Sequence, residues 1–169
     1  MRPASKVGVL APLIDIRIDS PLWYGQPLAE LTVRDAIAAA AAALATTDGE
    51  VSIVLTNDEG IKKLNRDWRG IEKPTNVLSF PAPKTKSTGA TKFLGDIVIA
   101  YETLKQECDD EDRIFLHHLA HLTVHGFLHL IGYDHQNDSD AEEMEGLESK
   151  IMSALKMPDP YLARDLGDA

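Results

Sequence analysis

Three histidines in the last third of this sequence have the spacing of a catalytic metal site. His125 and His129 are four residues apart, so on an α-helix their imidazoles stack on one face and can reach the same ion. Gly132 can end that helix in the left-handed conformation, and His135 follows three residues later, where it can bind from the opposite side. Three protein nitrogens with one open position are typical of a catalytic zinc. We therefore expect one Zn²⁺ ion on His125, His129 and His135, in preference to nickel, iron or manganese.

Gly126 follows the first histidine of this motif directly. The metzincin proteases share the same histidine and glycine spacing but place a glutamate general base at that position. A glycine cannot accept a proton, so the sequence holds the metal-binding half of that arrangement without the peptidase base. Because a zinc-coordinated water ionises near neutral pH, we expect a hydrolysis in which this water needs less help from a general base, or one in which the base comes from elsewhere in the chain.

All six histidines of the chain lie between residues 117 and 135. His121 and His125 form an alternative ligand pair at the same helical spacing. We prefer His125 with His129, because Gly132 and the third histidine follow in register with them. The other three histidines are expected to pack or to support the ligands. These are His117, His118 and His121.

Composition limits the class of protein. The chain has 169 residues, and we expect a single metallohydrolase domain over 1–169 with loose ends at 1–10 and 158–169. The only cysteine, Cys108, excludes an intrachain disulfide and fits a cytoplasmic location. We expect that residue to be a semi-buried helix position. No apolar run approaches the roughly 20 residues that span a bilayer, so we expect no membrane association.

The charge of the chain is unevenly distributed. The formal net charge is -10, yet residues 62–92 carry eight basic side chains against two acidic ones. An acidic balance by itself argues against nucleic-acid binding, whereas a basic segment can offer one patch to a polyanion. Two solvated faces without a partner explain the same pattern, and charge alone does not separate these interpretations.

Hydrophobic periodicity predicts the elements that position these residues. Apolar residues alternate or cluster in four predicted strands, at 13–19, 51–55, 76–80 and 93–100. Helical spacing predicts five helices, at 31–45, 57–70, 101–107, 112–131 and from 138 onward. This order favours an α+β domain, with a small mixed β-sheet of about four strands covered by about five or six helices and a metzincin-like zinc helix.

Local signals place the ends of these elements. Thr32, Asn57 and Asp138 are expected N-caps, because their side-chain oxygens can accept from free helical N–H groups. The acidic run at 109–112 is expected to cap the zinc helix and to interact with the positive end of its dipole. Gly95 marks a bulge or a close approach of the backbone in the last strand.

Three motifs in order resemble the bacterial YbeY family of endoribonucleases. The histidine motif at 125–135 looks like the signature of that family. The segment Leu64–Gly70, followed by Lys73–Pro81, is similar to a second motif, and Leu94–Ile99 to a third. The resemblance extends from about residue 13 to 155.

The resemblance implies a function and a set of partners. It implies a metal-dependent endoribonuclease specific for single-stranded RNA, acting in 16S rRNA 3′-end maturation and ribosome quality control. It implies a zinc ion on His125, His129 and His135, with Arg69 as a functional arginine in the groove beside it. It also implies a small-subunit ribosomal protein and a ribosome-assembly GTPase as partners. We take Arg69 and His125 as the candidate catalytic residues.

The chemistry of Arg69 is compatible with this implication. A guanidinium fork matches the charge that develops on the equatorial oxygens of a phosphodiester better than an ammonium group does. Without the resemblance, a surface salt bridge would explain Arg69 equally well. Trp68 and Phe80 could stack on RNA bases, although we expect both to pack in the core.

Other polar residues have two interpretations each. Asp134 could orient an imidazole or form a turn. Three residues could bind sugar or phosphate or could cap a strand, namely Thr75, Asn76 and Ser79. Asp96, at a strand end after Gly95, could be a polar group near the site or a cap partner for a helix or loop.

Two other classes of function stay open at this stage. A metallopeptidase or another metallohydrolase is one of them, and Gly126 weighs against a peptidase. The second is a non-catalytic ribosome assembly factor with a structural zinc. A fourth protein ligand would favour a structural ion, whereas an open coordination position would favour catalysis.

Overall fold

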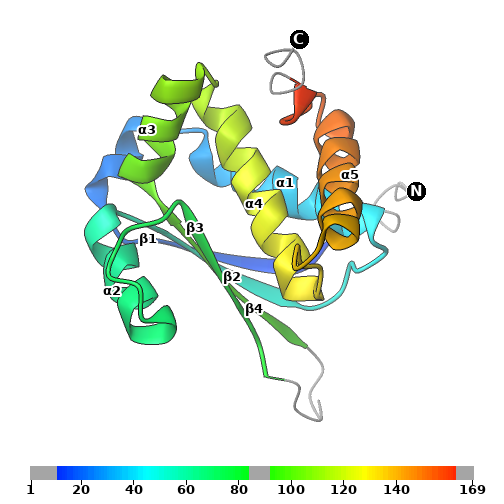
Figure 1. Ribbon diagram of the computed structural model, residues 1–169, viewed down its shortest axis with the longest axis horizontal. Coiled ribbons are helices and arrows are strands. Elements are labelled where there is room, and N and C mark those ends of the chain that lie inside the picture. Colours follow the sequence, from blue (N-terminus) through cyan, green and yellow to red (C-terminus); the bar gives the residue numbers. More distant parts are fainter. Residues whose placement is uncertain (1–10, 84–91, 163–169) are drawn as a thin grey trace, which may run out of the picture.

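A four-stranded mixed sheet forms the centre of the computed structural model, which describes residues 11–83 and 92–162 (Figure 1). The strand order is β1-β2-β4-β3. The first three of these run parallel, and β3 pairs antiparallel with β4, so β3 is an edge strand. The strands are β1 (Leu13–Ile18), β2 (Glu50–Thr56), β3 (Val77–Pro81) and β4 (Phe93–Ala100).

Five α-helices and one short 3-10 helix cover this sheet in the described part of the chain. Their order along the chain confirms the predicted α+β class. They are η2 (Pro21–Gly25), α1 (Ala29–Ala43), α2 (Asp58–Arg69), α3 (Tyr101–Glu111), α4 (Phe115–Ile131) and α5 (Asp138–Ala154).

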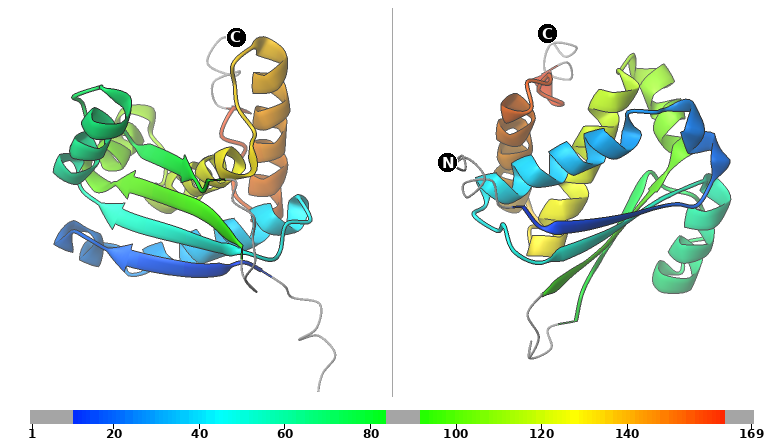
Figure 2. Two further views of the ribbon diagram at one scale, coloured as in Figure 1. Left: turned by 90° about the horizontal axis from the view of Figure 1, so that it is seen from below. Right: turned by 180° about the vertical axis from the view of Figure 1, so that it is seen from behind.

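Alternate residues of β4 point to two separate cores, as the pleat of a strand requires. Ile97 and Ile99 belong to the main core, to which α1 and α4 contribute. Val98 and Ala100 belong to a smaller cluster with Ile61 of α2. The α2 helix therefore covers the opposite face of the sheet, and both views of Figure 2 show it apart from α1, α4 and α5.

The α4 helix is the central buried helix that the sequence predicted. Ten of its seventeen residues are buried. Within residues 11–83 and 92–162, no single helix is long and apolar enough to cross a bilayer. The helices α3 and α4 pass that test as a pair on length and composition, but the chain bends by 119° between them.

Gly95 is a point of close backbone approach, as predicted. Its φ is +141°, and a Cβ there would lie 2.4 Å from the Phe80 carbonyl oxygen and 2.7 Å from a methyl carbon of Leu130. The register between β2 and β4 also shifts next to Val51. Glycine is needed here because φ is positive and because the backbone of β3 at Phe80 and Pro81 leaves no space for a Cβ.

Two predicted N-caps are wrong. The α1 helix begins at Ala29, and the Thr32 hydroxyl lies inside it, donating to the Leu28 carbonyl at 2.8 Å. The N-cap of α5 is Asn137, one residue earlier than predicted, and its side chain accepts from the Asp140 N–H. The predicted N-cap of α2 is confirmed, since the Asn57 side chain accepts from the Gly60 N–H.

The acidic run at 109–112 does not cap α4. Its first three residues form the last turn of α3, and Asp112 takes the left-handed conformation that ends that helix. Lys105 and Asp109 form an ion pair at 2.7 Å one helical turn apart, which supports this extension of α3. No side chain caps α4, so the interaction that was expected with its dipole is wrong.

The segment after α5 folds back on the domain as far as it is described. Ser149 donates a hydrogen bond to Asp159 at 2.8 Å, and Arg113 donates to the Pro160 carbonyl at 3.1 Å. Of the loose end predicted at 158–169, residues 158–162 are held by these contacts, and 163–169 lie outside the described residues, as does the loose end predicted at 1–10.

Candidate metal centre

The three predicted metal ligands converge at the carboxyl end of α4. His125 and His129 lie one turn apart on that helix, and their Nε2 atoms are 3.1 Å apart. Gly132 ends the helix with a φ of +113°, and His135 returns to the same place from the following turn. One nitrogen from each ring lies within 4.8 Å of the other two. Among the described residues, no further His, Cys, Asp or Glu joins this group.

Hydrogen bonds on the far side of two rings fix their tautomers. His129 Nδ1 lies 2.9 Å from the Tyr133 carbonyl oxygen, and His125 Nδ1 lies 2.9 Å from Glu148 Oε2. A carbonyl and an ionised carboxylate can only accept, so both Nδ1 atoms carry the proton. The Nε2 atoms of neutral His125 and His129 therefore present lone pairs to each other.

Glu148 is the residue that orients His125. Only 1% of its surface is exposed, and its Oε1 accepts from His121 Nε2 at 2.5 Å and from the Tyr161 hydroxyl. Burial alone would raise the pKa of this carboxyl, but the hydrogen bonds from His121 and His125 lower it to about 2. The group is thus a buried carboxylate, and such groups commonly orient metal-binding histidines.

The donor set fits a metal ion. The Nε2 atoms of His125 and His129 are 3.1 Å apart, and their facing lone pairs repel each other unless a cation lies between them. Burial and the neighbouring His125 lower the pKa of His129, which disfavours a second proton on that ring. Zinc–nitrogen bonds of about 2.0–2.1 Å in tetrahedral geometry place two ligand nitrogens about 3.3 Å apart, close to the distance found here.

Gly126 faces the sheet from the buried side of α4. A Cβ at this position would lie 3.0 Å from Ile97 Cγ2 and 3.1 Å from Ser79 Oγ. The Ser79 hydroxyl also donates to the Gly126 carbonyl at 3.1 Å. A carboxylate side chain at position 126 would have no room, so the metzincin base is excluded by packing as well as by residue type.

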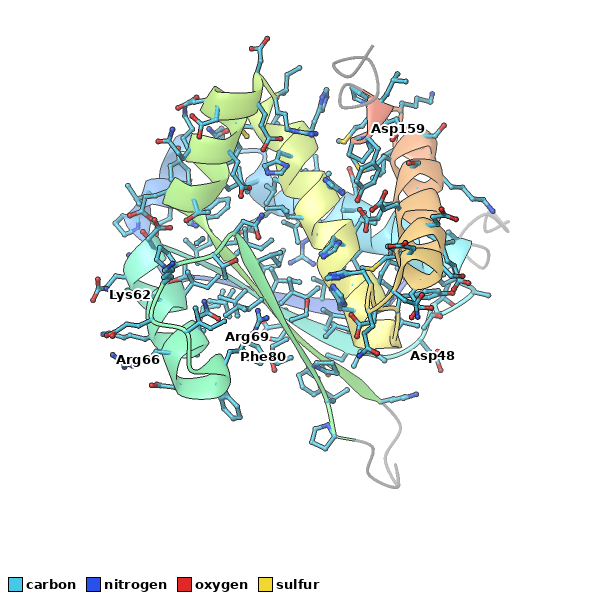
Figure 3. All side chains as sticks on the ribbon, viewed as in Figure 1. Asp48, Lys62, Arg66, Arg69, Phe80 and Asp159 are labelled. Atoms are coloured by element: carbon cyan, nitrogen blue, oxygen red, sulfur yellow. The ribbon has the colours of Figure 1, made fainter. Side chains whose placement is uncertain are left out.

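The histidines open into a cleft of about 840 Å³. Its walls come from the end of α2, the whole of β3, α4 and the segment after α5. Arg69, the last residue of α2, lines this cleft together with His125, His129 and His135. Figure 3 shows Arg69 extending towards β3, whereas Lys62 and Arg66 point to the outer side of α2. The structure thus brings the predicted arginine and the predicted ligands to one cleft.

A second polar group lines the cleft away from the three ligands. His118 Nε2 lies 2.8 Å from Glu107 Oε1, and the Asn76 amide donates to the same carboxylate at 3.0 Å. Burial raises the pKa of Glu107, but these two hydrogen bonds outweigh that effect and lower it. His121 therefore supports the ligand His125 through Glu148, as predicted, whereas His118 pairs with Glu107 in another part of the cleft.

Other predicted residues have mixed outcomes. Trp68 is 71% exposed, so its predicted place in the core is wrong, whereas half-buried Phe80 does pack against the smaller cluster. The Asp134 carboxylate accepts from the His135 backbone N–H at 2.8 Å, which makes it a turn residue. Cys108 is buried, and burial raises the pKa of its thiol to about 11.

The four strand-end candidates divide into two pairs. Asn76 and Ser79 line the cleft, whereas Thr75 and Asp96 do not. Glu148 was missed because it lies far from every motif. One signal was available, since Glu148 stands between Met144 and Ile151 on the apolar face of α5, and a buried acid nearly always has a partner.

Comparisons with known proteins agree with this geometry. The chain matches the family described as endoribonuclease YbeY over residues 26–156. It is 51% identical over 159 residues to a protein named endoribonuclease YbeY from Bradyrhizobium diazoefficiens, covering 90% of this chain and 87% of that one. It is also 51% identical over 158 residues to the protein of the same name from Nitrobacter winogradskyi, covering 89% and 82%.

A solved structure shares the fold. The solution structure of a Thermotoga maritima protein aligns with a TM-score of 0.55 and 23% identity, covering 85% of this chain and 92% of that one. The fold, the ordered motifs and the extent of sequence identity lead to one conclusion. This chain belongs to the YbeY family of endoribonucleases.

Proposed function

We propose that this protein is a zinc-dependent endoribonuclease that hydrolyses single-stranded RNA in 16S rRNA 3′-end maturation and ribosome quality control. The observation that carries the proposal is the pair of facing Nε2 atoms of His125 and His129, whose tautomers are already set for a metal. Arg69 in the same cleft supplies the phosphate-binding group that a nuclease needs. The names of the relatives support RNA as the substrate class.

Each residue has a separate role in this proposal. His125, His129 and His135 hold the ion, while Glu148 and the Tyr133 carbonyl keep two of the rings in the required tautomer. When bound, zinc would polarise a phosphoryl oxygen and lower the pKa of a coordinated water.

Arg69 would bind the phosphodiester beside the ion and stabilise the negative charge that builds up during hydrolysis. Its position at the end of α2 supports this role, because the side chain reaches the cleft from the side opposite α4.

The proposal includes the cellular setting. Cytoplasmic ribosome assembly is the expected location, with a small-subunit ribosomal protein and a ribosome-assembly GTPase as partners. The acidic balance of the whole chain supports a need for partners, since a net charge of -10 weakens unaided binding to RNA.

Two alternatives are less well supported. A metallopeptidase needs a carboxylate base, and the packing of Gly126 against Ile97 leaves no space for one at the metzincin position. A structural zinc needs a fourth protein ligand, and the described residues offer only three in this group.

The test compares cleavage of labelled single-stranded RNA, duplex RNA and casein by the purified protein. We expect cleavage of single-stranded RNA alone, its loss with chelator and its recovery with zinc. Replacing Arg69 with Ala should slow cleavage by roughly 100-fold or more, as loss of one charge-stabilising donor does. The matched control is Arg66→Ala, since Arg66 is also exposed on α2 but points to its outer side.

The cellular role is tested with the same variants. Cells that carry only the Arg69→Ala or His129→Ala protein should accumulate 16S rRNA precursors. RNA cleavage that persists in chelator and in His129→Ala would refute the metal-dependent nuclease. Normal rRNA processing in those cells, together with cleavage in vitro, would refute only the ribosomal role.

A further inference from the structure

Trp68 exposes a large apolar surface beside the metal centre. The indole is 71% exposed although it is among the largest apolar side chains in the chain. It lines the same cleft as Arg69 and the three histidines. Tryptophan is enriched at binding interfaces, so a fixed indole at the edge of a polar cleft is a candidate contact for a ligand.

The indole is held in place from one side. Its ring centroid lies 5.9 Å from that of Phe80, with the two planes inclined by 58°. Phe80 in turn packs on the smaller core cluster, which includes Leu78 and Val98. The contact therefore orients Trp68 without burying it, and a ligand that stacks there finds a ring with little freedom left to lose.

The charges around Trp68 indicate what kind of ligand fits. Residues 62–73 carry five basic side chains and two acidic ones, in a chain of net charge -10. Arg69 follows directly and reaches the cleft. The cleft thus pairs a flat apolar group with the guanidinium of Arg69, which suits a planar base attached to a phosphate.

We propose that Trp68 is a base-stacking platform, on which one nucleobase of single-stranded RNA lies at the entrance to the cleft while Arg69 engages a phosphate of the same strand. The inference rests on the proposed nuclease function and adds a subsite to it. Stacking is tolerant of base identity, because every base offers a flat face. The platform therefore holds unpaired nucleotides, and it discriminates against duplex RNA, in which the bases are stacked on one another.

Tryptophan fluorescence tests this directly. The chain has two tryptophans, and Trp23 is 1% exposed with its indole N–H bonded to the Thr56 carbonyl at 2.7 Å. Rapid mixing of the zinc-loaded protein with a short single-stranded RNA should therefore quench Trp68 alone, before cleavage is appreciable. An oligonucleotide with abasic sites at every position should quench little.

Three variants separate stacking from packing. Trp68→Ala should weaken binding of the RNA and raise KM by about tenfold, within the range found when stacking aromatics are removed, while kcat changes less. Trp68→Phe should keep most of the affinity. The matched control is Tyr24→Ala, because Tyr24 on η2 is 72% exposed but does not line the cleft, and it should bind RNA as the parent does.

Each other outcome overturns the inference. If Trp68→Ala binds and cleaves RNA like the parent, the platform is wrong while the nuclease stands. If Trp68→Ala weakens binding of the abasic strand as much as binding of the normal strand, the residue acts through packing and not through stacking. Stronger quenching by an acidic peptide than by RNA would identify a protein ligand instead. If the parent protein neither binds nor cleaves RNA, the proposed function fails first and the platform with it.

Discussion

Replacement of Glu148 by Gln is the sharpest test of how the metal centre is built. The carboxylate accepts three hydrogen bonds, from His121, His125 and Tyr161. A carboxamide of the same shape keeps one acceptor oxygen and gains an N–H₂ donor. If the donor faces His125, that ring must accept on Nδ1 and move its proton to Nε2, the atom that faces the metal site. If the N–H₂ group faces His121 and Tyr161 instead, the donors of those two side chains lose their acceptor.

The size of the effect follows from the environment of the carboxylate. Lowering its pKa from 4.5 to about 2 corresponds to about 3 kcal/mol of favourable interaction with the charged form. Because the folded-state pKa is lowered, this stabilisation is present above pH 4.5 and is lost as the pH falls towards 2. We therefore expect Glu148→Gln to lose about 3 kcal/mol of unfolding free energy near neutral pH in the metal-free protein. Loss of a carboxylate behind a metal-binding histidine should also weaken zinc affinity by roughly 10- to 100-fold.

Two measurements separate these effects. Urea unfolding in the presence of chelator reports the stability of the metal-free fold. Competition for zinc with a chromophoric chelator reports the zinc affinity alone. It is measured without urea, where the variant is folded. The matched control is Glu145→Gln, an exposed acid on α5 less than one turn away, which should change neither quantity appreciably.

Nitrogen-15 NMR of the histidine rings provides a third readout. In the parent, His125 should carry its proton on Nδ1, and in Glu148→Gln this tautomer should lose population. The reasoning fails if Glu148→Gln binds zinc as tightly as Glu145→Gln and keeps the Nδ1–H tautomer. A purely structural role would lower stability but leave the zinc affinity of the folded variant unchanged.

Three further outcomes are expected. In urea unfolding, Gly146→Ala on α5 should stabilise the protein by about 1 kcal/mol, because no atom outside the local helix backbone lies within 4 Å of a Cβ there. Gly126→Ala should instead destabilise the protein by about 1 kcal/mol, because its Cβ meets Ile97 and Ser79, and equal stabilisation by both changes would contradict this packing argument. Because the pKa of Glu107 is lowered in the folded state, its contribution to stability should be present above pH 4.5 and should vanish as the pH falls below that value. Glu107→Gln should therefore flatten the pH dependence of unfolding in that range, and an unchanged pH profile would count against this role of Glu107. Chelator should lower the melting temperature of the zinc-loaded protein but not that of His129→Ala, and identical shifts in both would argue against the site.

The parts of this protein that sequence could predict are those with a local cause. The order of strands and helices follows from periods of two and 3.6 in the apolar residues, and all nine predicted elements exist. The ligand triad follows from helical spacing and a glycine turn, which are contained within eleven residues. Local geometry alone brings these three rings together, so no knowledge of the fold was needed.

The parts that sequence missed have tertiary causes. Glu148 meets His125 only because α5 packs beside α4, and no local pattern links residues 23 positions apart. Trp68 was expected in the core because its spacing with Ile61 and Leu64 is helical. In the structure Trp68 lies in the last turn of α2, where its indole contacts Phe80 and stays 71% exposed. The acidic run was assigned to the wrong helix, since side-chain pairs within α3 extended that helix by one turn.

The packing of Gly126 joins the fold and the chemistry in one position. The α4 helix approaches β4 so closely here that even a Cβ would lie 3.0 Å from Ile97 Cγ2, which requires a small residue. The same requirement removes the carboxylate that a peptidase would use. Installing a glutamate there should therefore unfold the protein and should not create a peptidase, because the new side chain would enter the core between α4 and the sheet. The groups that line the cleft come instead from α2, β3, α3, α4 and the segment after α5. Among them, Arg69 and Trp68 are the residues at which we expect specificity for RNA to be set.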